Sequence, residues 1–131
     1  MDKFLGKFSP QIYALLRITA GFMFTCHGLQ KIFGVLGGHQ PGIFTQIWFG
    51  GVIELVGGLL ILIGWRTSYA AFLCSGVMAV AYFQVHQPQG LLPVQNQGEL
   101  AALYCFVFLF IAARGAGTWS VDARTKKSAA G

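Results

Sequence analysis

The sequence has very few charged residues. Of its 131 residues, 9 are Lys or Arg and 4 are Asp or Glu, so that only 10% are charged. Soluble domains usually carry about 25%. Hydrophobic residues make up 55% of the chain, and the mean hydropathy is +0.62. This composition excludes an ordinary soluble domain and predicts an integral membrane protein, whose first partner is the lipid bilayer.

The three cysteines do not form a redox motif. Cys26, Cys74 and Cys105 are single residues in three different apolar runs, and no CxxC pair occurs. This spacing argues against a dithiol relay, and we expect the three thiols to be small buried side chains. The sequence also has no flavin, haem or iron–sulfur motif. Any redox chemistry would therefore need a bound quinone or a partner subunit.

Basic residues are absent from the most polar stretch of the chain, residues 84–99. They gather instead near the two ends and in a short turn at 64–68. An excess of Lys and Arg marks the cytoplasmic side of a membrane protein. The sequence therefore predicts a multi-pass protein of the bacterial inner (cytoplasmic) membrane with both termini inside. The net charge of +5 reflects this orientation signal, and no nucleic-acid partner is expected.

Four apolar segments predict four membrane helices, because about 20 apolar residues span a bilayer. The predicted spans are residues 12–33, 47–64, 68–86 and 99–113. The fold class is an all-α membrane protein, a bundle of four transmembrane helices with N-in/C-in topology. One membrane domain would cover residues 1–122, with residues 1–10 as an interfacial lead-in. Residues 123–131 are expected to be a disordered cytoplasmic tail.

The second span carries a carboxylate near its middle. On a helix, Glu54 shares one face with the glycines Gly50, Gly51, Gly57 and Gly58. Such a face predicts close backbone approach to neighbouring helices. An ionisable residue at membrane depth is a functional hypothesis, so Glu54 and Arg17 are the catalytic candidates that would orient the core or pass a proton. The structural alternative is a buried ion pair between Glu54 and Arg17.

A second polar group is expected at the outer ends of spans one, three and four. Its members are the ligand-binding candidates His27, Lys31, His86, Asn96 and Glu99. His and Lys can donate hydrogen bonds to a quinone carbonyl or a phenolate, and Glu can exchange a proton. A zinc or iron site would use His27, His86 and Glu99, but no local ligand spacing favours a metal. The remaining alternative is that these side chains are only hydrated at the membrane interface.

Several stretches, in the right order, resemble the DoxX family. The opening signature of that family is similar to residues 15–34, LLRITAGFMFTCHGLQKIFG, with its arginine, its histidine–glycine pair and the lysine four residues after the histidine. The later blocks are similar to residues 53–67 (IELVGGLLILIGWRT), 82–105 (YFQVHQPQGLLPVQNQGELAALYC) and 114–122 (RGAGTWSVD). The resemblance implies a four-helix inner-membrane protein with both termini in the cytoplasm. Its polar positions would be Arg17, His27, Lys31, Glu54, His86, Asn96 and Glu99.

The resemblance also implies a function. The family is named after a subunit of a membrane thiosulfate:quinone oxidoreductase, and other members resemble partners of catechol dioxygenases or of detoxifying enzymes. We therefore expect a protein that binds a quinone-like molecule in an outward-facing polar pocket and serves as the membrane subunit of a redox or detoxification system. If it is an enzyme, it would be a quinone-linked oxidoreductase subunit, with a redox partner subunit. The alternatives are an oligomeric transporter or channel for a small solute or protons, and a scaffold that recruits soluble enzymes.

Overall fold

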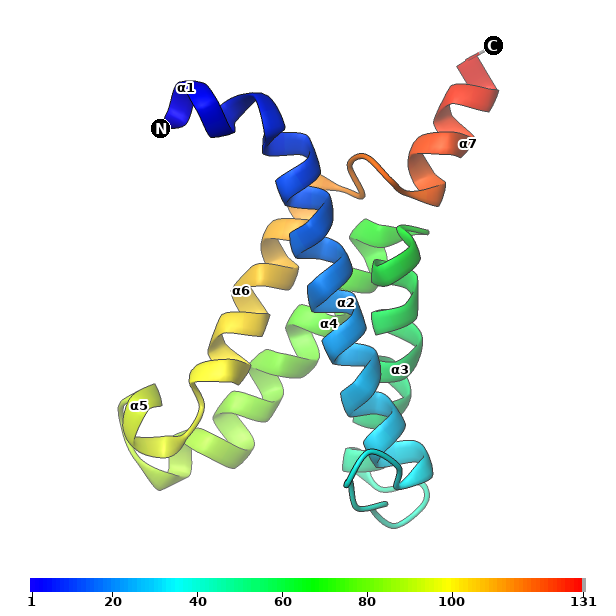
Figure 1. Ribbon diagram of the computed structural model, residues 1–131. Helices are drawn as coiled ribbons and strands as arrows, with labels where there is room; N and C mark the ends of the chain where they lie inside the picture. The colour runs from blue at the N-terminus through cyan, green and yellow to red at the C-terminus, as the bar shows by residue number, and fades with distance from the viewer. Residues whose placement is uncertain (131) are drawn as a thin grey trace.

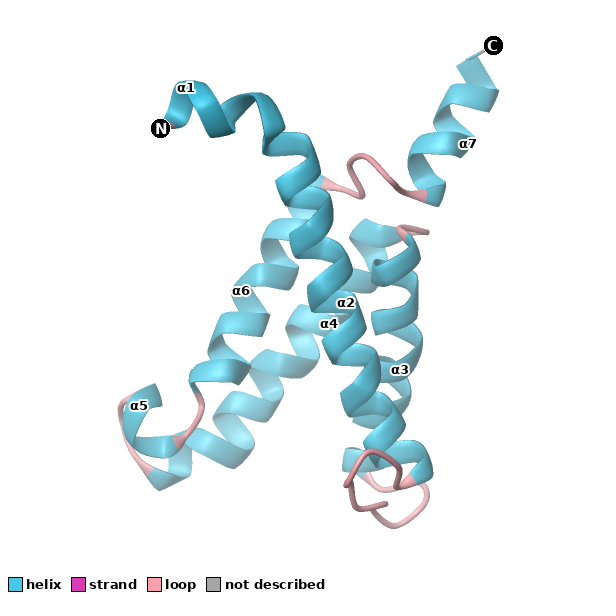
Figure 2. Ribbon diagram, viewed as in Figure 1, coloured by secondary structure: helices cyan, strands magenta, loops and turns pink. Residues whose placement is uncertain are grey.

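Helices are the regular secondary structure of the part of the chain that the structure describes. The computed structural model describes residues 1–130, which contain no β-strand (Figure 2). The long helices are α2 (Ser9–Phe33), α3 (Gln46–Ile63), α4 (Thr67–Ala81) and α6 (Glu99–Arg114). The shorter elements are α1 (Asp2–Leu5), η1 (Gly6–Phe8), η2 (Tyr82–His86), η3 (Gln87–Gln89), α5 (Pro93–Asn96) and α7 (Val121–Ala130). The all-helical prediction is confirmed.

Within residues 1–130, three helical segments are long and apolar enough to cross a membrane. They are Asp2–Phe33, Gln46–Ile63 and Thr67–Gln89. The third segment is longer than α4 because the chain continues through the π-helical turn η2 and the 3₁₀ turn η3 as far as Gln89. Helix α6 has 16 residues, fewer than the roughly 20 of a typical span. A fourth span therefore stays a prediction.

The long helices pack as two antiparallel pairs, α2 with α3 and α4 with α6 (Figure 1). Helix α3 also packs against α4. Both chain termini lie at one end of the bundle, which we call the terminal end, with the turn Gly64–Arg66 and the segment 115–120. The connections 34–45 and 87–98 lie at the opposite end, the loop end. The two pairs diverge towards the loop end, so the polar residues that each pair carries there are held apart (Figure 1).

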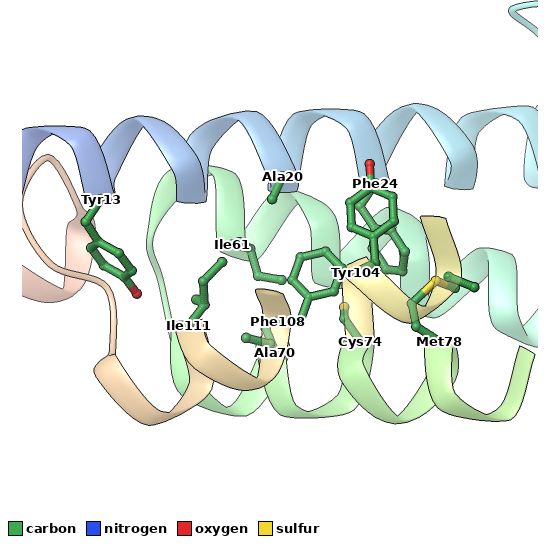
Figure 3. Close-up of a cluster of buried hydrophobic side chains, with 12 residues drawn as sticks. Tyr13, Ala20, Phe24, Ile61, Ala70, Cys74, Met78, Tyr104, Phe108 and Ile111 are labelled. Carbon is green, nitrogen blue, oxygen red and sulfur yellow. The ribbon is translucent and has the colours of Figure 1, made fainter. Parts of the chain in front are cut away.

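An aromatic and aliphatic core holds the two pairs together (Figure 3). Phe24 of α2 packs on Phe108 of α6 with ring centroids 4.7 Å apart, and Tyr104 stacks on Phe108 at 5.4 Å. Ile61 and Ile111 are fully buried beside them. Aromatic pairs at these separations stabilise beyond the area that they bury. This core fixes α2 against α6 in spite of the divergence of the helices.

The contact between α2 and α3 depends on glycine. A Cβ atom added at Gly28 would lie 2.4 Å from the backbone nitrogen of Leu55, closer than real Cβ atoms approach. Added Cβ atoms at Gly51, Gly57 and Gly58 would lie between 2.4 and 2.7 Å from atoms of α2 or α4. Small residues allow membrane helices to pack closely where there is no hydrophobic drive between them. The predicted close approach is confirmed for these three positions, whereas Gly50 faces open space.

Gly28→Ala should separate α2 from α3. The new methyl group would meet backbone atoms of Leu55, which cannot move without shifting the helix, and overpacking of this kind costs about 1–3 kcal/mol. We expect a clear fall in the thermal unfolding midpoint in detergent. The matched control is Gly76→Ala, also inside a helix but with nothing within 4 Å of the added Cβ. It should be neutral or slightly stabilising, and equal losses in both variants would contradict the close packing.

The C-terminal residues form a helix where the sequence predicts a disordered tail. Residues 123–130 belong to α7, and Gly131 lies outside the described residues. The Ser120 hydroxyl accepts a hydrogen bond from the Ala123 amide at 3.2 Å and so caps the first turn. Ala, Arg and Lys in the helix favour this conformation. The prediction rested on terminal position and charge, and it overlooked the cap.

Candidate functional site

Arg17 connects distant parts of the chain at the terminal end. Its side chain is fully buried, and its guanidinium donates to the carbonyls of Ile61 and Leu62 at 2.6 and 2.9 Å. It also donates to the carbonyls of Trp119 at 2.8 Å and Thr118 at 3.4 Å. The C-terminal end of a helix has free carbonyls and partial negative charge, which suit a cation. Arg17 therefore joins the end of α3 to the segment after α6, and the ion pair with Glu54 considered above does not form.

Asp122 completes this connection. Its carboxylate accepts hydrogen bonds from the amides of Arg66 at 2.9 Å and Thr67 at 3.1 Å, so it caps the start of α4. Its own amide donates to the Gly64 carbonyl at 2.9 Å. Burial alone would raise the pKa of Asp122, but the hydrogen bonds from Thr67 and Arg66 outweigh it and hold that pKa below its ordinary value. We call Arg17 together with residues 115–122 the terminal clamp.

The lowered pKa of Asp122 predicts an acid-sensitive clamp. A carboxylate with a lower pKa in the folded state stabilises fully above its unfolded pKa of about 3.9, and this contribution is lost as pH falls through the folded pKa. Asp122→Asn should cost about 1 kcal/mol at pH 7, as lost helix caps do, and should make stability less dependent on pH below about 4. Thermal unfolding between pH 7 and 2.5 measures both effects. Asp2→Asn, which changes an exposed carboxylate, should change neither, and equal effects would contradict the cap.

A buried ion pair joins α2 and α3 in the body of the bundle. The Lys31 Nζ atom lies 2.5 Å from Oε1 of Glu54. Glu54 is 1% exposed, and its second oxygen, Oε2, has no hydrogen-bond partner among the described residues. The side chain of Lys31 is 33% exposed. A buried carboxylate with an unused acceptor is costly in apolar surroundings. The pair is therefore the strongest candidate site, and it is accessible from the lysine side.

The directions of the two side chains explain why they meet. Side chains on a helix lean towards its N-terminus, and α2 and α3 run antiparallel (Figure 1). Lys31 leans away from the loop end, and Glu54 leans towards it. Gly51, one turn before Glu54, lies against Cβ of Lys31 and leaves room for the lysine to pass. The sequence predicts the two residues in different groups because their backbones lie at different depths along the helices.

His27 lies one turn before Lys31 and faces α6. Its ring meets the ring of Tyr104 edge to face, with centroids 6.5 Å apart, and its side chain is half-buried. The Tyr104 hydroxyl is buried and has no hydrogen-bond partner among the described residues. Tyr104 was not predicted as a site residue, because nothing in the sequence distinguishes it from the other aromatic residues of its span. The Tyr104 hydroxyl, beside His27, is therefore a second buried polar group that can form a further hydrogen bond.

His86 and Asn96 form a separate cluster at the loop end. The His86 Nδ1 atom lies 3.1 Å from the Asn96 carbonyl oxygen. The Asn96 side chain is almost fully buried, donates to the Gly90 carbonyl at 2.9 Å and accepts from the Gly98 amide at 2.8 Å. Neither side chain forms a hydrogen bond with α2 or α3 in the described chain. The polar atoms of Asn96 are used to shape the connection between α4 and α6.

Glu99 is exposed at the start of α6. It borders a shallow depression of about 490 Å³ together with Val94, Gln97, Leu100 and Leu103. In residues 1–130, no three His, Cys, Asp or Glu side chains are grouped closely enough to hold a metal ion. The metal alternative of His27, His86 and Glu99 is therefore not assembled. The predicted outer pocket divides into the region of His27 and Lys31, the cluster of His86 and Asn96, and the exposed Glu99.

Comparisons with known proteins identify relatives of this chain. The sequence model of the DoxX family matches residues 12–87. An uncharacterized protein of Haemophilus influenzae is 38% identical over 125 residues, which cover 90% of this chain and 93% of the relative. An uncharacterized membrane protein of Mycobacterium tuberculosis is 29% identical over an alignment of 143 positions, gaps included, that covers 92% of this chain and 85% of the relative. No solved structure matches.

Proposed function

Since this chain belongs to the DoxX family of membrane proteins, we propose that it binds a quinone-like or other small redox-active molecule beside the Lys31–Glu54 ion pair. In this proposal it serves as the membrane subunit of a redox or detoxification system. One observation carries the proposal: a buried carboxylate has an unpartnered oxygen, and the lysine that pairs with it is partly exposed. Ionisable residues among apolar helices are costly to bury, and in membrane proteins they commonly mark ligand or proton sites.

The proposed topology has four spans, with both termini in the cytoplasm of a bacterium. Apart from Arg17 and Lys31, the Lys and Arg residues are Lys3, Lys7, Arg66, Arg114, Arg124, Lys126 and Lys127. All seven belong to the segments of the terminal end (Figure 1). This distribution favours the terminal end as the cytoplasmic side. Helix α6 packs along α4, so a bilayer that surrounds α4 also surrounds α6.

The side chains around the pair suit a small aromatic ligand with polar oxygens. Lys31 offers a donor and a positive charge in a poorly screened site, which favours a phenolate oxygen. The unpartnered Glu54 oxygen accepts a hydrogen bond or a proton from a ligand hydroxyl. His27 and the Tyr104 hydroxyl offer further polar contacts, and the nearby ring of Phe24 is apolar. His86 and Glu99 remain candidates for the entrance from the loop end, whereas the polar atoms of Asn96 are already used.

These residues can bind a ligand and move a proton, but they cannot store electrons. Oxidation of a hydroquinone to a quinone releases two protons and two electrons. Glu54 can take one proton and water on the exposed side of Lys31 the other, and the two electrons must go to a redox group outside these side chains. A partner subunit with such a group is therefore part of the proposal.

Tyr104→Phe is the sharpest test of the binding site. It removes a hydroxyl that has no partner in the structure, so it should leave the stability of the protein unchanged or slightly higher. The proposed ligand bonds this hydroxyl, so binding of a short-chain ubiquinone and its quinol to the protein in nanodiscs should weaken by about tenfold. Unchanged binding would contradict this contact. Tyr69→Phe, which changes an exposed tyrosine on α4, is the matched control and should bind as the wild type does.

The same preparation distinguishes binding from transport. In proteoliposomes, the wild-type protein and Glu54→Gln should show the same background proton flux. If flux depends on Glu54 and neither form of the quinone binds at any concentration, the redox proposal fails and a transporter replaces it.

A further inference from the structure

The first helical segment is longer than a membrane needs. Asp2–Phe33 is continuous over 32 residues, or about 48 Å at 1.5 Å per residue if straight. The hydrocarbon core of a bilayer is only about 30 Å thick. The segment is not straight, because α1 and η1 turn aside from the axis of α2 at the terminal end (Figure 1). Pro10 has no amide hydrogen, and the Ser9 amide bonds the Gly6 carbonyl in a 3₁₀ turn, which produces the bend.

Residues 1–8, the N-terminal arm, are amphipathic. At about 100° per residue, Met1, Phe4, Leu5 and Phe8 fall within roughly 100° of arc. Phe4 is 63% exposed, and the other three side chains are exposed as well. No other element of residues 1–130 covers this apolar face, although Phe4 and Phe8 contact each other edge to face at 6.2 Å. An apolar face of this kind beside a membrane span fits the boundary between headgroups and acyl chains.

Lys7 borders this apolar face, and Lys3 lies on the opposite face of the arm. The Lys7 Nζ atom lies 5.0 Å from the ring centroids of both Phe4 and Phe8, so the ammonium group stands directly beside the aromatic pair. Apolar side chains with a lysine at their edge allow the rings to enter a membrane while the charge stays among the headgroups. Two exposed tryptophans, Trp65 and Trp119, belong to segments at the same end of the bundle. Tryptophan prefers the depth of the headgroups.

We propose that the N-terminal arm is a binding segment for anionic phospholipid headgroups and lies flat in the membrane surface next to α2. Phe4, Leu5 and Phe8 insert between the acyl chains, and Lys3 and Lys7 bind the phosphates. Helix α7 also carries basic residues, but it lacks an apolar face, because Val121 is its one large exposed apolar side chain in the described residues. Because the arm combines an apolar face with lysines and α7 does not, the arm is the proposed lipid contact. This inference is independent of what binds at Lys31 and Glu54.

Hydrogen–deuterium exchange of the full-length protein in nanodiscs tests the proposal. Amides of residues 2–8 should exchange on the order of tenfold more slowly in bilayers with half phosphatidylglycerol than in pure phosphatidylcholine, since each lysine adds to the attraction of an anionic surface. The double variant Lys3→Gln/Lys7→Gln should lose this difference, and 0.5 M NaCl should weaken it. Phe4→Ser/Phe8→Ser should speed exchange in both bilayers.

The matched control is Lys126→Gln/Lys127→Gln, which removes the same charge from α7 and should leave the arm protected. Exchange that is equal in both lipids for the wild-type protein would overturn the proposal. So would an equal loss of protection in the α7 variant, because the effect would then come from net charge and not from the arm.

Discussion

Arg17→Met is expected to lower the free energy of unfolding by about 3–5 kcal/mol. The buried guanidinium donates to four backbone carbonyls. A hydrogen bond to a charged group contributes about 1.5–3 kcal/mol net, and bonds made by one group do not add in full. Methionine fills the space of the side chain but leaves these carbonyls without a donor. Unfolding by heat or by sodium dodecyl sulfate in detergent micelles measures the loss. Faster hydrogen exchange in residues 115–122 would show that the terminal clamp has opened.

Two further variants define the role of this side chain. Arg17→Lys should recover little, because an ammonium group cannot reach the carbonyls of Ile61 and Trp119 together as the planar guanidinium does. Arg124→Met removes an exposed arginine of α7 and should change stability by less than about 0.5 kcal/mol. An Arg17→Met protein as stable as this control would show that the clamp contributes nothing.

Lys31→Met is expected to cost about 3–5 kcal/mol, because it leaves the Glu54 carboxylate buried without its cation. Glu54→Gln should cost less. Lys31 is partly exposed, so without its partner it can turn towards water at the loop end. The double variant Lys31→Met/Glu54→Leu should recover much of the loss, since it removes both charges. The thermal unfolding midpoints of the three variants at pH 7 give this order, with Lys126→Met as the exposed control.

The order of these midpoints is the test. If Glu54→Gln were as damaging as Lys31→Met, the partial exposure of Lys31 would not lower the cost of losing its partner. If the double variant were no more stable than Lys31→Met alone, the loss would come from packing and not from an unpaired charge.

The sequence predicts features that arise from nearby residues. The glycine face around Glu54 follows from helical spacing within one segment, and the structure bears it out at Gly51, Gly57 and Gly58. The positions of the long helices follow from continuous apolar runs in the same way. Such patterns need no knowledge of the tertiary arrangement.

Features that join distant residues could not be predicted in this way. The acceptors of Arg17 are main-chain carbonyls, which every residue carries, so no side-chain pattern identifies them. The Lys31–Glu54 pair depends on the lean of two antiparallel side chains and on the space at Gly51. The role of Asn96 depends on backbone groups of Gly90 and Gly98, which lie close only after the connection has folded.

The terminal clamp links the first long helix to a segment that the ribosome makes only after all four long helices. Arg17 is separated from Thr118 and Trp119 by 101 and 102 residues along the chain. During synthesis, α2 therefore enters the membrane with a guanidinium that lacks two of its four acceptors, and it keeps this defect while α3, α4 and α6 are inserted. Only synthesis of the segment after α6 supplies the missing carbonyls. A product that terminates before residue 118 has every long helix but not these acceptors, so cellular quality control can distinguish it from a product that contains residues 118 and 119.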